Sequence, residues 1–279
     1  MKGKIATIGF FDGVHKGHRF LFRQLDELGK ARGLQPLIVT FEQHPRLALQ
    51  SDFVPRLLST SPERKALLSA FGEVLMLPFD AIQPLTAEQF MRRLHDEYRV
   101  SVLLMGYDHR FGSDRLKHPQ DYRRIGAQTG IEVVTSGEFM DGEWHVSSTE
   151  IRGALENGNI LLANELLGRP YKLSGTVVHG KGLGRTIGFP TANIEPDPSK
   201  IIPKAGVYAV RVHACSIDRS PAILNISTDG TIEVHIPSFR GDLYGQRLDV
   251  QFSRFIREEK QFDDLDELKE KIKEDIASL

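Results

Sequence analysis

The stretch Ile5-Ala6-Thr7-Ile8-Gly9-Phe10-Phe11-Asp12-Gly13-Val14-His15-Lys16-Gly17-His18 sets the architecture of the first half of the chain. An apolar strand, expected over Ile5–Phe10, passes through a glycine-containing turn into a helix that begins near Gly17. In an open α/β sheet, ligands bind beyond the carboxyl ends of the strands, where glycines admit the backbone and a helix start offers free N–H groups. This turn is therefore the first candidate ligand site.

Two histidines stand at the start of the expected helix. His15 and His18 are three residues apart, so one helical turn can aim both imidazoles at the same point. Such a pair would neutralise charge that grows on a phosphate while a nucleotide α-phosphorus is attacked. The alternative is two solvent-exposed histidines without a role. The glycine pattern and the position after the first strand favour the catalytic interpretation.

Strands and helices alternate through residues 1–168. The expected strands are Ile5–Phe10, Pro36–Phe41, Glu73–Leu77, Val100–Met105 and Ile131–Thr135. One helix is expected to start at Ser61-Pro62-Glu63 with Ser61 as N-cap, and another after Thr86, which can form a capping box with Gln89. This alternation predicts right-handed βαβ units, a mostly parallel sheet and a Rossmann-like first domain.

The second half has a different rhythm. Strands are expected at Leu173–Val178, Val207–His213, Ala222–Ile226, Thr231–Ile236 and Leu248–Phe255, with turn residues but no helix pattern between them. This pattern predicts a compact antiparallel barrel, followed by a helix from Asp264. The boundary is expected near Gly168-Arg169-Pro170, which gives domains of residues 1–168 and 169–279.

Composition limits the partners. The 279 residues include 36 basic and 37 acidic side chains, so no polycationic surface favours nucleic acid or anionic membranes. The single Cys215 cannot form an internal disulfide, which fits a reducing compartment, and neither a membrane span nor a secretory signal is evident. We therefore expect a soluble, cytoplasmic protein with small-molecule partners, and its oligomeric state is left open.

Three more polar clusters follow later strands of the first half. They are Thr40-Phe41-Glu42-Gln43-His44-Pro45, Gly106-Tyr107-Asp108-His109-Arg110-Phe111-Gly112 and Ser147-Ser148-Thr149-Glu150-Ile151-Arg152. The last cluster could simply be a well-capped helix, because Ser147 and Glu150 have capping-box spacing. Hydroxyls, free N–H groups and Arg152 at one helix start would also clamp a polyphosphate. Convergence of four polar loops at one sheet edge favours a functional site.

The second half contains a glycine-rich segment and an acidic strand. Gly180, Gly182, Gly184 and Arg185 precede Gly188-Phe189-Pro190-Thr191-Ala192-Asn193. Such an arch can wrap phosphates, and Thr191 and Asn193 offer neutral oxygens for Mg²⁺, although a flexible hairpin is the alternative. Strand alternation puts Glu233 and His235 on the face opposite Ile232, Val234 and Ile236. Glu233 could be a general base or merely a solvent-facing carboxylate.

Residues 1–168 resemble the HxGH nucleotidyltransferases, and more closely the FMN adenylyltransferase domain of bacterial bifunctional riboflavin kinase/FAD synthetases. The motifs G-x-F-D-G-V-H-x-G-H, T-F-x-x-H-P, G-x-D-F-x-F-G and S-S-T-x-I-R occur in order, except that His109 stands where the family usually has Phe. The resemblance implies that His15 and His18 act on ATP phosphates and the transition state. It implies further ATP contacts from Gly9, Phe10, Asp12, Gly13, Gly17, Ser148, Thr149 and Arg152, and flavin contacts from His44, Asp108 and Phe111.

Residues 171–279 are similar to the riboflavin kinase domain. The matches are the G-F-P-T-A-N segment, Glu233-Val234-His235, Asp242-Leu243-Tyr244-Gly245, and Arg257 with Lys260 and Phe262. The resemblance implies a six-stranded antiparallel barrel with a C-terminal helix. It assigns Mg²⁺ and ATP to Thr191 and Asn193, the base for the riboflavin 5′-hydroxyl to Glu233, ATP contacts to Gly180, Gly182, Gly184 and Arg185, and a flavin contact to Arg257.

One departure concerns the connection after Asn225. The family usually has a spacer there, whereas Ser227-Thr228-Asp229-Gly230 leads almost directly into Thr231. The leading hypothesis is a bifunctional enzyme that converts riboflavin to FMN and then FMN to FAD, with ATP and Mg²⁺. The first alternative keeps the adenylyltransferase but has a kinase-impaired, flavin-binding barrel. Others are a flavin or nucleotide sensor and a transferase for another phosphorylated substrate.

Overall fold

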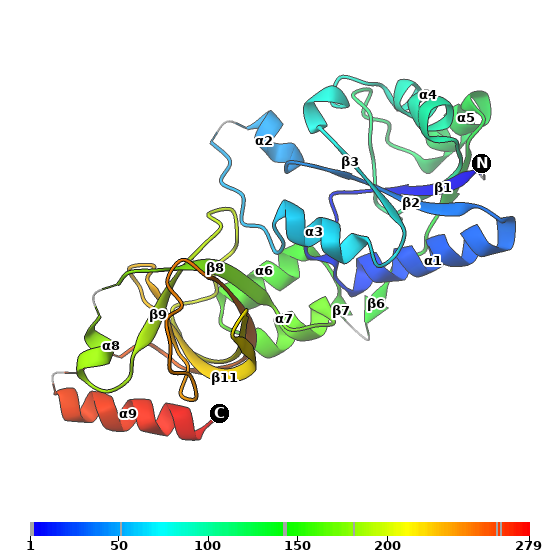
Figure 1. Cartoon of the computed structure of the whole chain (residues 1–279). Coiled ribbons are helices and arrows are strands. Elements are labelled where there is room, and N and C mark those ends of the chain that lie inside the picture. Colours follow the sequence, from blue (N-terminus) through cyan, green and yellow to red (C-terminus); the bar gives the residue numbers. More distant parts are fainter. Residues whose placement is uncertain (1–2, 51, 142–143, 181, 261, 263) are drawn as a thin grey trace. The chain divides into compact units, whose positions relative to one another are not determined.

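The chain forms two compact units, drawn as a ribbon in Figure 1. The computed structural model describes residues 3–50, 52–141, 144–180, 182–260, 262 and 264–279. One unit comprises Met1–Pro55 and Ser59–Ser147, and the other comprises Arg56–Leu58 and Ser148–Leu279. The boundary predicted at residues 168/169 would instead place residues 148–168, which contain two helices, in the first domain. That boundary stays a prediction.

A five-stranded parallel sheet forms the centre of the first unit. Its order is β3-β2-β1-β4-β5, and every adjacent pair is parallel. The strands are β1 (Lys4–Ile8), β2 (Gln35–Phe41), β3 (Glu73–Leu77), β4 (Val100–Met105) and β5 (Glu132–Thr135). The predicted parallel sheet is confirmed, with each strand within two residues of its expected bounds.

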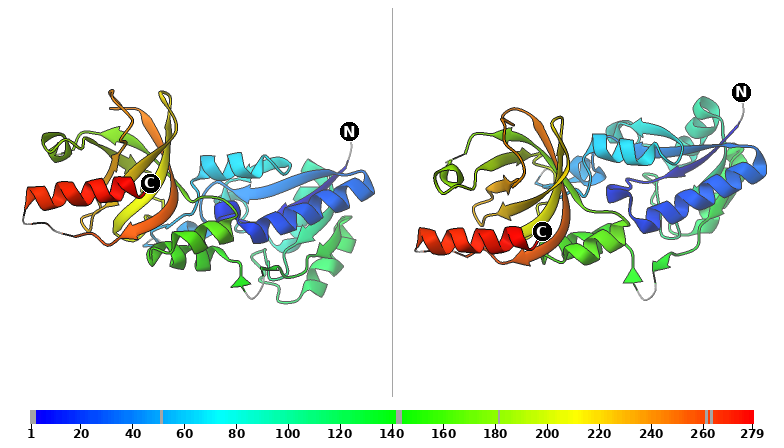
Figure 2. Two further views of the ribbon diagram at one scale, coloured as in Figure 1. Left: turned by 90° about the horizontal axis from the view of Figure 1, so that it is seen from below. Right: turned by 60° about the horizontal axis from the view of Figure 1, so that its bottom comes forward.

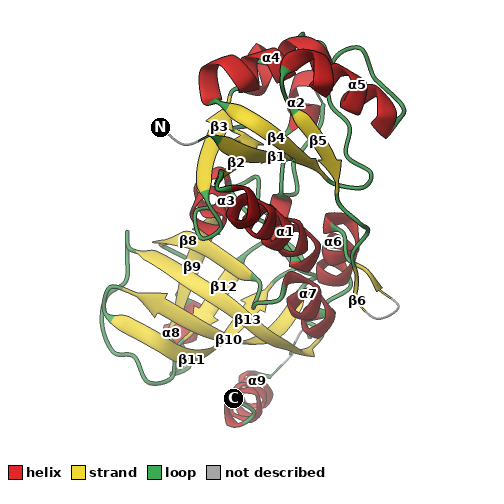
Figure 3. Ribbon diagram, turned by 90° about the vertical axis from the view of Figure 1, so that its right-hand side faces the viewer, coloured by secondary structure: helices red, strands yellow, loops and turns green. Residues whose placement is uncertain are grey.

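Helices cover both faces of this sheet (Figure 3). The covering helices are α1 (Lys16–Arg32), α3 (Ser61–Leu68), α4 (Ala87–Tyr98) and α5 (Pro119–Thr129). The unit also contains α2 (Pro45–Leu49), the 3₁₀ turns η1 (Asp12–Val14) and η2 (Phe79–Ala81), and a separate pair of β6 (Met140–Asp141) and β7 (Trp144–His145). Helices α4 and α5 share one buried cluster with Ala6 and Ile8, and α1 and α3 share the other with Ile5. Successive side chains of β1 point to opposite faces, so both faces carry a core.

Helix starts in this unit follow their capping residues. Thr86 and Gln89 form the predicted capping box of α4. At α3 the N-cap is Thr60, one residue before the predicted Ser61, and it forms a reciprocal capping box with Glu63. A capping box needs its acidic partner three residues on, and Glu63 meets that spacing from Thr60 only.

A closed barrel of six antiparallel strands forms the second unit (Figure 2), as predicted. Its order is β10-β11-β12-β9-β8-β13, with β8 (Lys172–Val178), β9 (Thr191–Pro196), β10 (Gly206–Ala214), β11 (Ile217–Ile226), β12 (Ile232–His235) and β13 (Arg247–Arg257). The helices are α6 (Ser148–Glu156), α7 (Ile160–Leu167), α8 (Leu183–Thr186) and α9 (Leu265–Ala277). Strand β9 is absent from the five strands that the pattern indicated, and it closes the barrel between β12 and β8.

Among the described residues, no helix combines the length and the apolar character needed to cross a membrane.

Candidate active sites

The turn after β1 has a strained backbone. Phe11 and Val14 have φ angles of 54° and 44°, and Gly13 has a φ of 75°. A side chain in this left-handed region costs on the order of 1–3 kcal/mol, and such strain clusters where a site needs a particular backbone. An added Cβ at Gly9 would lie 2.7 Å from the ring of Phe11, which explains the glycine.

The two histidines lie face to face at the start of α1. Their ring centroids are 3.6 Å apart and the planes differ by 22°. His15 is the N-cap of the helix, and its Nδ1 accepts from the backbone N–H of His18 at 3.4 Å. An accepting Nδ1 leaves the proton of a neutral ring on Nε2. The structure thus brings His15 and His18 together as their spacing predicted, with His15 only 5% exposed.

Asp12 is buried beneath this turn. Its Oδ1 accepts from the backbone N–H of Ser59 at 3.0 Å, while the hydroxyl of Ser59 accepts from the N–H of Gly13 at 3.0 Å. Asp12 and Gly13 were predicted as ATP contacts, and these bonds also give them a structural task. They tie the turn to the residue that precedes helix α3.

The ends of β1 and β2 meet through Phe10 and His44. Their rings make an edge contact at 4.6 Å, and the hydroxyl of Thr40 donates to the carbonyl of Phe10 at 3.2 Å. His44 caps α2, with Nδ1 accepting from the N–H of Arg46 at 3.1 Å. The structure therefore brings together these two predicted site residues from separate motifs.

The loop after β4 is held by Tyr122. Its hydroxyl accepts from the N–H of Phe111 at 3.0 Å and donates to the carbonyl of Phe111 at 2.8 Å. The Phe111 ring packs on Tyr122 with centroids 4.9 Å apart, so this predicted flavin contact also packs against the core. Asp108 is exposed.

His109, the departure from the family pattern, lines a cavity of about 130 Å³ together with Arg110 and Lys117. Its Nε2 is buried and has no hydrogen-bond partner among the described residues. Burial lowers the pKa of His109 from 6.5 to about 4, and the charge of Asp108 opposes that shift. A neutral imidazole is therefore expected here at pH 7.

The predicted phosphate clamp lies at the start of α6. Ser148, Thr149 and Arg152 all belong to this helix, whose contacts group it with the second unit. The Arg152 Nε donates to the carbonyl of Arg56 at 2.8 Å. Burying Ile151 and Leu155 on the opposite side fixes which face of the helix carries these polar groups.

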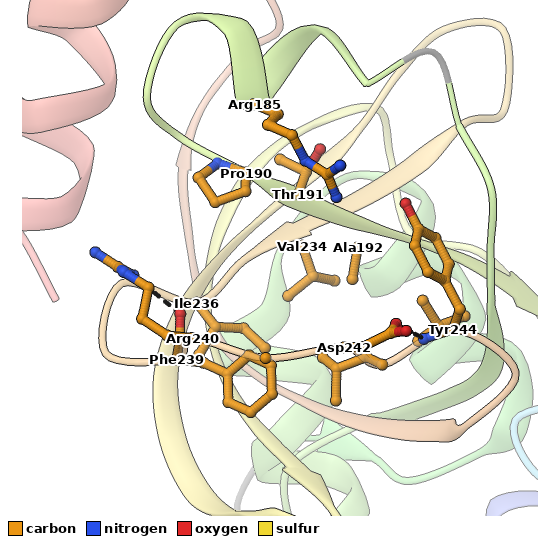
Figure 4. A pocket seen from close by; sticks show the side chains of 13 residues that line it. Arg185, Pro190, Thr191, Ala192, Val234, Ile236, Phe239, Arg240, Asp242 and Tyr244 are labelled. Atoms are coloured by element: carbon orange, nitrogen blue, oxygen red, sulfur yellow. Dashed lines mark hydrogen bonds between the residues drawn. The ribbon is translucent and has the colours of Figure 1, made fainter.

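In the second unit, strand β12 separates two cavities. Val234 and Ile236 line one of about 540 Å³, drawn in Figure 4. Glu233 and His235 line the other, of about 260 Å³. The predicted alternation is thus confirmed, and Glu233 faces a cavity. Thr191 lines both cavities.

Several residues predicted for metal and phosphate lie close to Thr191 in the fold. The Thr191 hydroxyl donates to Glu233 Oε1 at 3.5 Å, and Asn193 lies opposite Glu233 in the β9–β12 register. An added Cβ at Gly180 would collide with the Asn193 amide, and one at Gly184 would collide with the carbonyl of Phe189. Both glycines are therefore required by close approach of the arch to the Phe189–Asn193 segment.

Arg185 and Gly182 complete the arch. Arg185 lines the larger cavity and its side chain is drawn above Thr191 in Figure 4. Gly182 has a φ of 71°, which starts the short helix α8 in a conformation that favours glycine. The arch therefore brings the Arg185 guanidinium to the same cavity as Thr191.

The C-terminal helix forms a wall of the smaller cavity. Leu268, Ile272 and Asp275 of α9 line it. Asp275 accepts from Arg257 at two points, Nη2 at 2.8 Å and Nε at 3.1 Å. Arg257, the predicted flavin contact, thus also anchors α9 to the barrel strand β13.

One residue was underrated from the sequence. His235 was given no task, yet its Nδ1 donates to the carbonyl of Pro190 at 2.8 Å and so steadies the turn before Thr191. Its alternation with Glu233 was the available signal. The short β11–β12 connection is confirmed as a tight hairpin, closed by the N–H of Ser227 on the carbonyl of Thr231 at 2.9 Å.

The first unit is an α/β domain with an HxGH turn, and the second is a barrel with two cavities that share Thr191. This combination is that of a transferase with two catalytic domains. The family of FAD synthetases matches residues 1–150, and the family of riboflavin kinases matches residues 167–279. Curated relatives carry both names. The bifunctional riboflavin kinase/FMN adenylyltransferase of Escherichia coli K12 is 39% identical over 98% of this chain and 91% of its own length.

Others agree. The Pseudomonas fluorescens relative of the same name is 37% identical over 99% of this chain and 92% of its own. A crystal structure described as a macrolide-efflux protein from Streptococcus pneumoniae superposes with a TM-score of 0.89 at 32% identity, covering 99% of this chain and 93% of that one. The chain belongs to the bifunctional riboflavin kinase/FMN adenylyltransferase family.

Proposed function

We propose that this chain phosphorylates riboflavin to FMN with ATP and then adenylylates FMN to FAD with a second ATP. The observation that carries the kinase half is that Thr191 lines two cavities and has the Glu233 carboxylate 3.5 Å from its hydroxyl. One cavity would hold ATP and the other the flavin. The reacting hydroxyl and the γ-phosphorus would then meet beside Glu233.

In the kinase step, Glu233 would take the proton of the riboflavin 5′-hydroxyl while that oxygen attacks the γ-phosphorus. The bond to the β-phosphate oxygen breaks and ADP leaves. The larger cavity, with Arg185 beside it, suits the nucleotide, and the smaller one, with the apolar Leu268 and Ile272, suits the isoalloxazine ring. Arg257 is proposed as a flavin contact at the edge of this cavity.

Thr191 and Asn193 are proposed to hold Mg²⁺ together with the ATP phosphates. Oxygen atoms are the ligands that Mg²⁺ prefers. Two protein oxygens can suffice, because water molecules and substrate phosphates supply the other ligands of this cation. When bound, Mg²⁺ would neutralise phosphate charge. The Glu233 carboxylate beside Thr191 adds negative charge to the same region.

In the adenylylation step, a phosphate oxygen of FMN would attack the α-phosphorus of ATP, and pyrophosphate would leave. The stacked His15 and His18 are proposed to donate to the phosphate oxygens as charge builds. Gly9, Phe10, Asp12, Gly13 and Gly17 are proposed to shape the ATP site, and Ser148, Thr149 and Arg152 to hold the β- and γ-phosphates. His44, Asp108 and Phe111 are proposed as flavin contacts.

A time course with riboflavin, ATP and Mg²⁺, separating the flavins by chromatography, tests this function. FMN should appear first and FAD later, with ADP and pyrophosphate as co-products. Supplying FMN instead of riboflavin isolates the second step. FAD from FMN, without FMN from riboflavin at any enzyme concentration, would favour the kinase-impaired barrel that the tight β11–β12 hairpin suggests. Absence of both products would refute the proposal.

A further inference from the structure

Arg64 is a buried cation to which the proposed chemistry assigns no role. It lies on α3 with 0% exposure, one helical turn before Leu68, which is also fully buried. An arginine is almost never fully buried unless its charge is paired. No salt bridge to Arg64 occurs within the described part of the chain, and its Nε and Nη1 have no hydrogen-bond partner there. Such a group costs stability and calls for an explanation.

The residues that Arg64 contacts lie at or next to the residues proposed to bind ATP and flavin. Its guanidinium lies over the ring of Phe10, 4.0 Å from the centroid. Its Nη2 donates to the carbonyl of Phe41 at 2.5 Å and more weakly to that of Glu42 at 3.4 Å. Phe10 follows β1, whereas Phe41 and Glu42 end β2. One side chain therefore joins the ends of the two central strands.

The residues just before α3 also hold the turn that follows β1. Ser59, five residues before Arg64, binds Asp12 and Gly13. Burial lowers the pKa of Arg64 to about 10, and the charge of Asp12 opposes that shift. Arg64 therefore keeps its positive charge at pH 7. Phe10 in turn makes an edge contact with His44, with ring centroids 4.6 Å apart.

We propose that Arg64 is a positioning residue of the adenylylation site, which holds Phe10 and the end of β2 in the arrangement that receives the nucleotide and FMN. The inference rests on the proposed function. The planar guanidinium stacks on Phe10 while its Nη2 donates to both carbonyls, and an ammonium would keep the charge without the planar stacking group. The buried charge then lowers the stability of the fold, and in return it keeps the site ordered.

The test compares Arg64→Met, Arg64→Lys and Lys65→Met in the full-length protein. Methionine keeps apolar bulk without charge, and Lys65 is an exposed cation on the same helix that serves as the matched control. Arg64→Met is expected to lower kcat/KM for FMN adenylylation by about ten- to a hundredfold, mainly through higher KM for ATP and FMN, because misplaced contacts are costly. Arg64→Lys should recover part of this loss, and Lys65→Met should lose none.

Two further measurements separate positioning from folding. FMN formation from riboflavin should stay within about twofold of wild type in all three variants, since Arg64 and all its contacts belong to the first unit and the proposed kinase residues belong to the second. The unfolding midpoint of Arg64→Met should equal or exceed that of wild type, because an apolar residue of similar size often replaces a buried charge without loss.

Unchanged adenylylation kinetics in Arg64→Met, or equal loss of both activities, would overturn the inference and leave the proposed function intact. Wild-type protein that makes no FAD from FMN would refute the proposed function and the inference with it.

Discussion

The ion pair between Arg257 and Asp275 offers the most quantitative test of how the barrel holds its C-terminal helix. Asp275 has 4% and Arg257 20% of its side chain exposed. Asp275 makes two of its contacts at 2.8 and 3.1 Å. Removing one partner of such a buried pair leaves an uncompensated charge, which costs about 3–5 kcal/mol.

The two sides of the pair should not respond equally. Arg257→Met strands the more deeply buried carboxylate, so we expect a loss of about 3–4 kcal/mol. Asp275→Asn keeps an acceptor for a guanidinium that water can partly reach, so about 1.5–2 kcal/mol is expected from the weaker hydrogen bonds. The double variant Arg257→Met/Asp275→Asn should be less destabilised than the sum by about 1–2 kcal/mol, because neither charge is left.

Hydrogen exchange by mass spectrometry on the full-length protein measures this directly. Peptides from α9 should lose protection in each single variant, while peptides from α1 in the other unit supply the internal reference. Because Leu268 and Ile272 of α9 line the smaller cavity, the KM for riboflavin should rise as α9 loosens. An Arg257→Met variant with α9 protection within about 0.5 kcal/mol of wild type would refute the reasoning.

Three other variants test the remaining assignments. His15→Ala should lower FAD formation from FMN by about 10²-fold or more and leave FMN formation intact, and an equal loss of both would contradict independent sites. Glu233→Gln should lower FMN formation by about 10²–10⁴-fold and spare FAD formation from FMN, and normal kinase turnover would remove Glu233 as the base. His109→Phe should change the pH dependence of stability. The pKa of His109 is about 4 in the folded protein and 6.5 ordinarily, so the unfolded chain binds more protons between these two pH values. The free energy of unfolding of the wild type should therefore fall by up to about 3 kcal/mol as the pH falls from 6.5 to 4. Urea unfolding at pH 7 and pH 4 should show the variant gaining on wild type over this window, and a constant difference would contradict a buried neutral imidazole.

Local sequence determined the secondary structure well wherever periodicity was strong. The parallel strands Glu73–Leu77 and Val100–Met105 match their expected bounds, because Val, Leu and Met dominate both short segments and the neighbouring residues interrupt the apolar pattern. The spacing of His15 and His18 likewise predicted their meeting, since a single helical turn brings them to one side. These are short-range consequences of geometry along the chain.

Strand β9 shows where such reasoning stops. Its residues Thr191–Pro196 alternate polar and apolar side chains and only Ile194 is buried, so no continuous apolar run indicates a strand. Pairing supplies the order instead: hydrogen bonds to β12 on one side and β8 on the other close the barrel. Only this pairing sets Asn193 opposite Glu233, which is why the proposed metal and base residues share one place.

By itself, then, the sequence determined the alternation of elements, the paired histidines and the alternating faces of β12. Tertiary structure alone decided that Arg64 and Asp275 are buried, since nothing in their immediate neighbours distinguishes them from surface charges. The physical reason is that periodicity is a property of consecutive residues. The burial of a charge depends on groups brought together from distant strands and helices, such as Phe10 and Phe41 around Arg64.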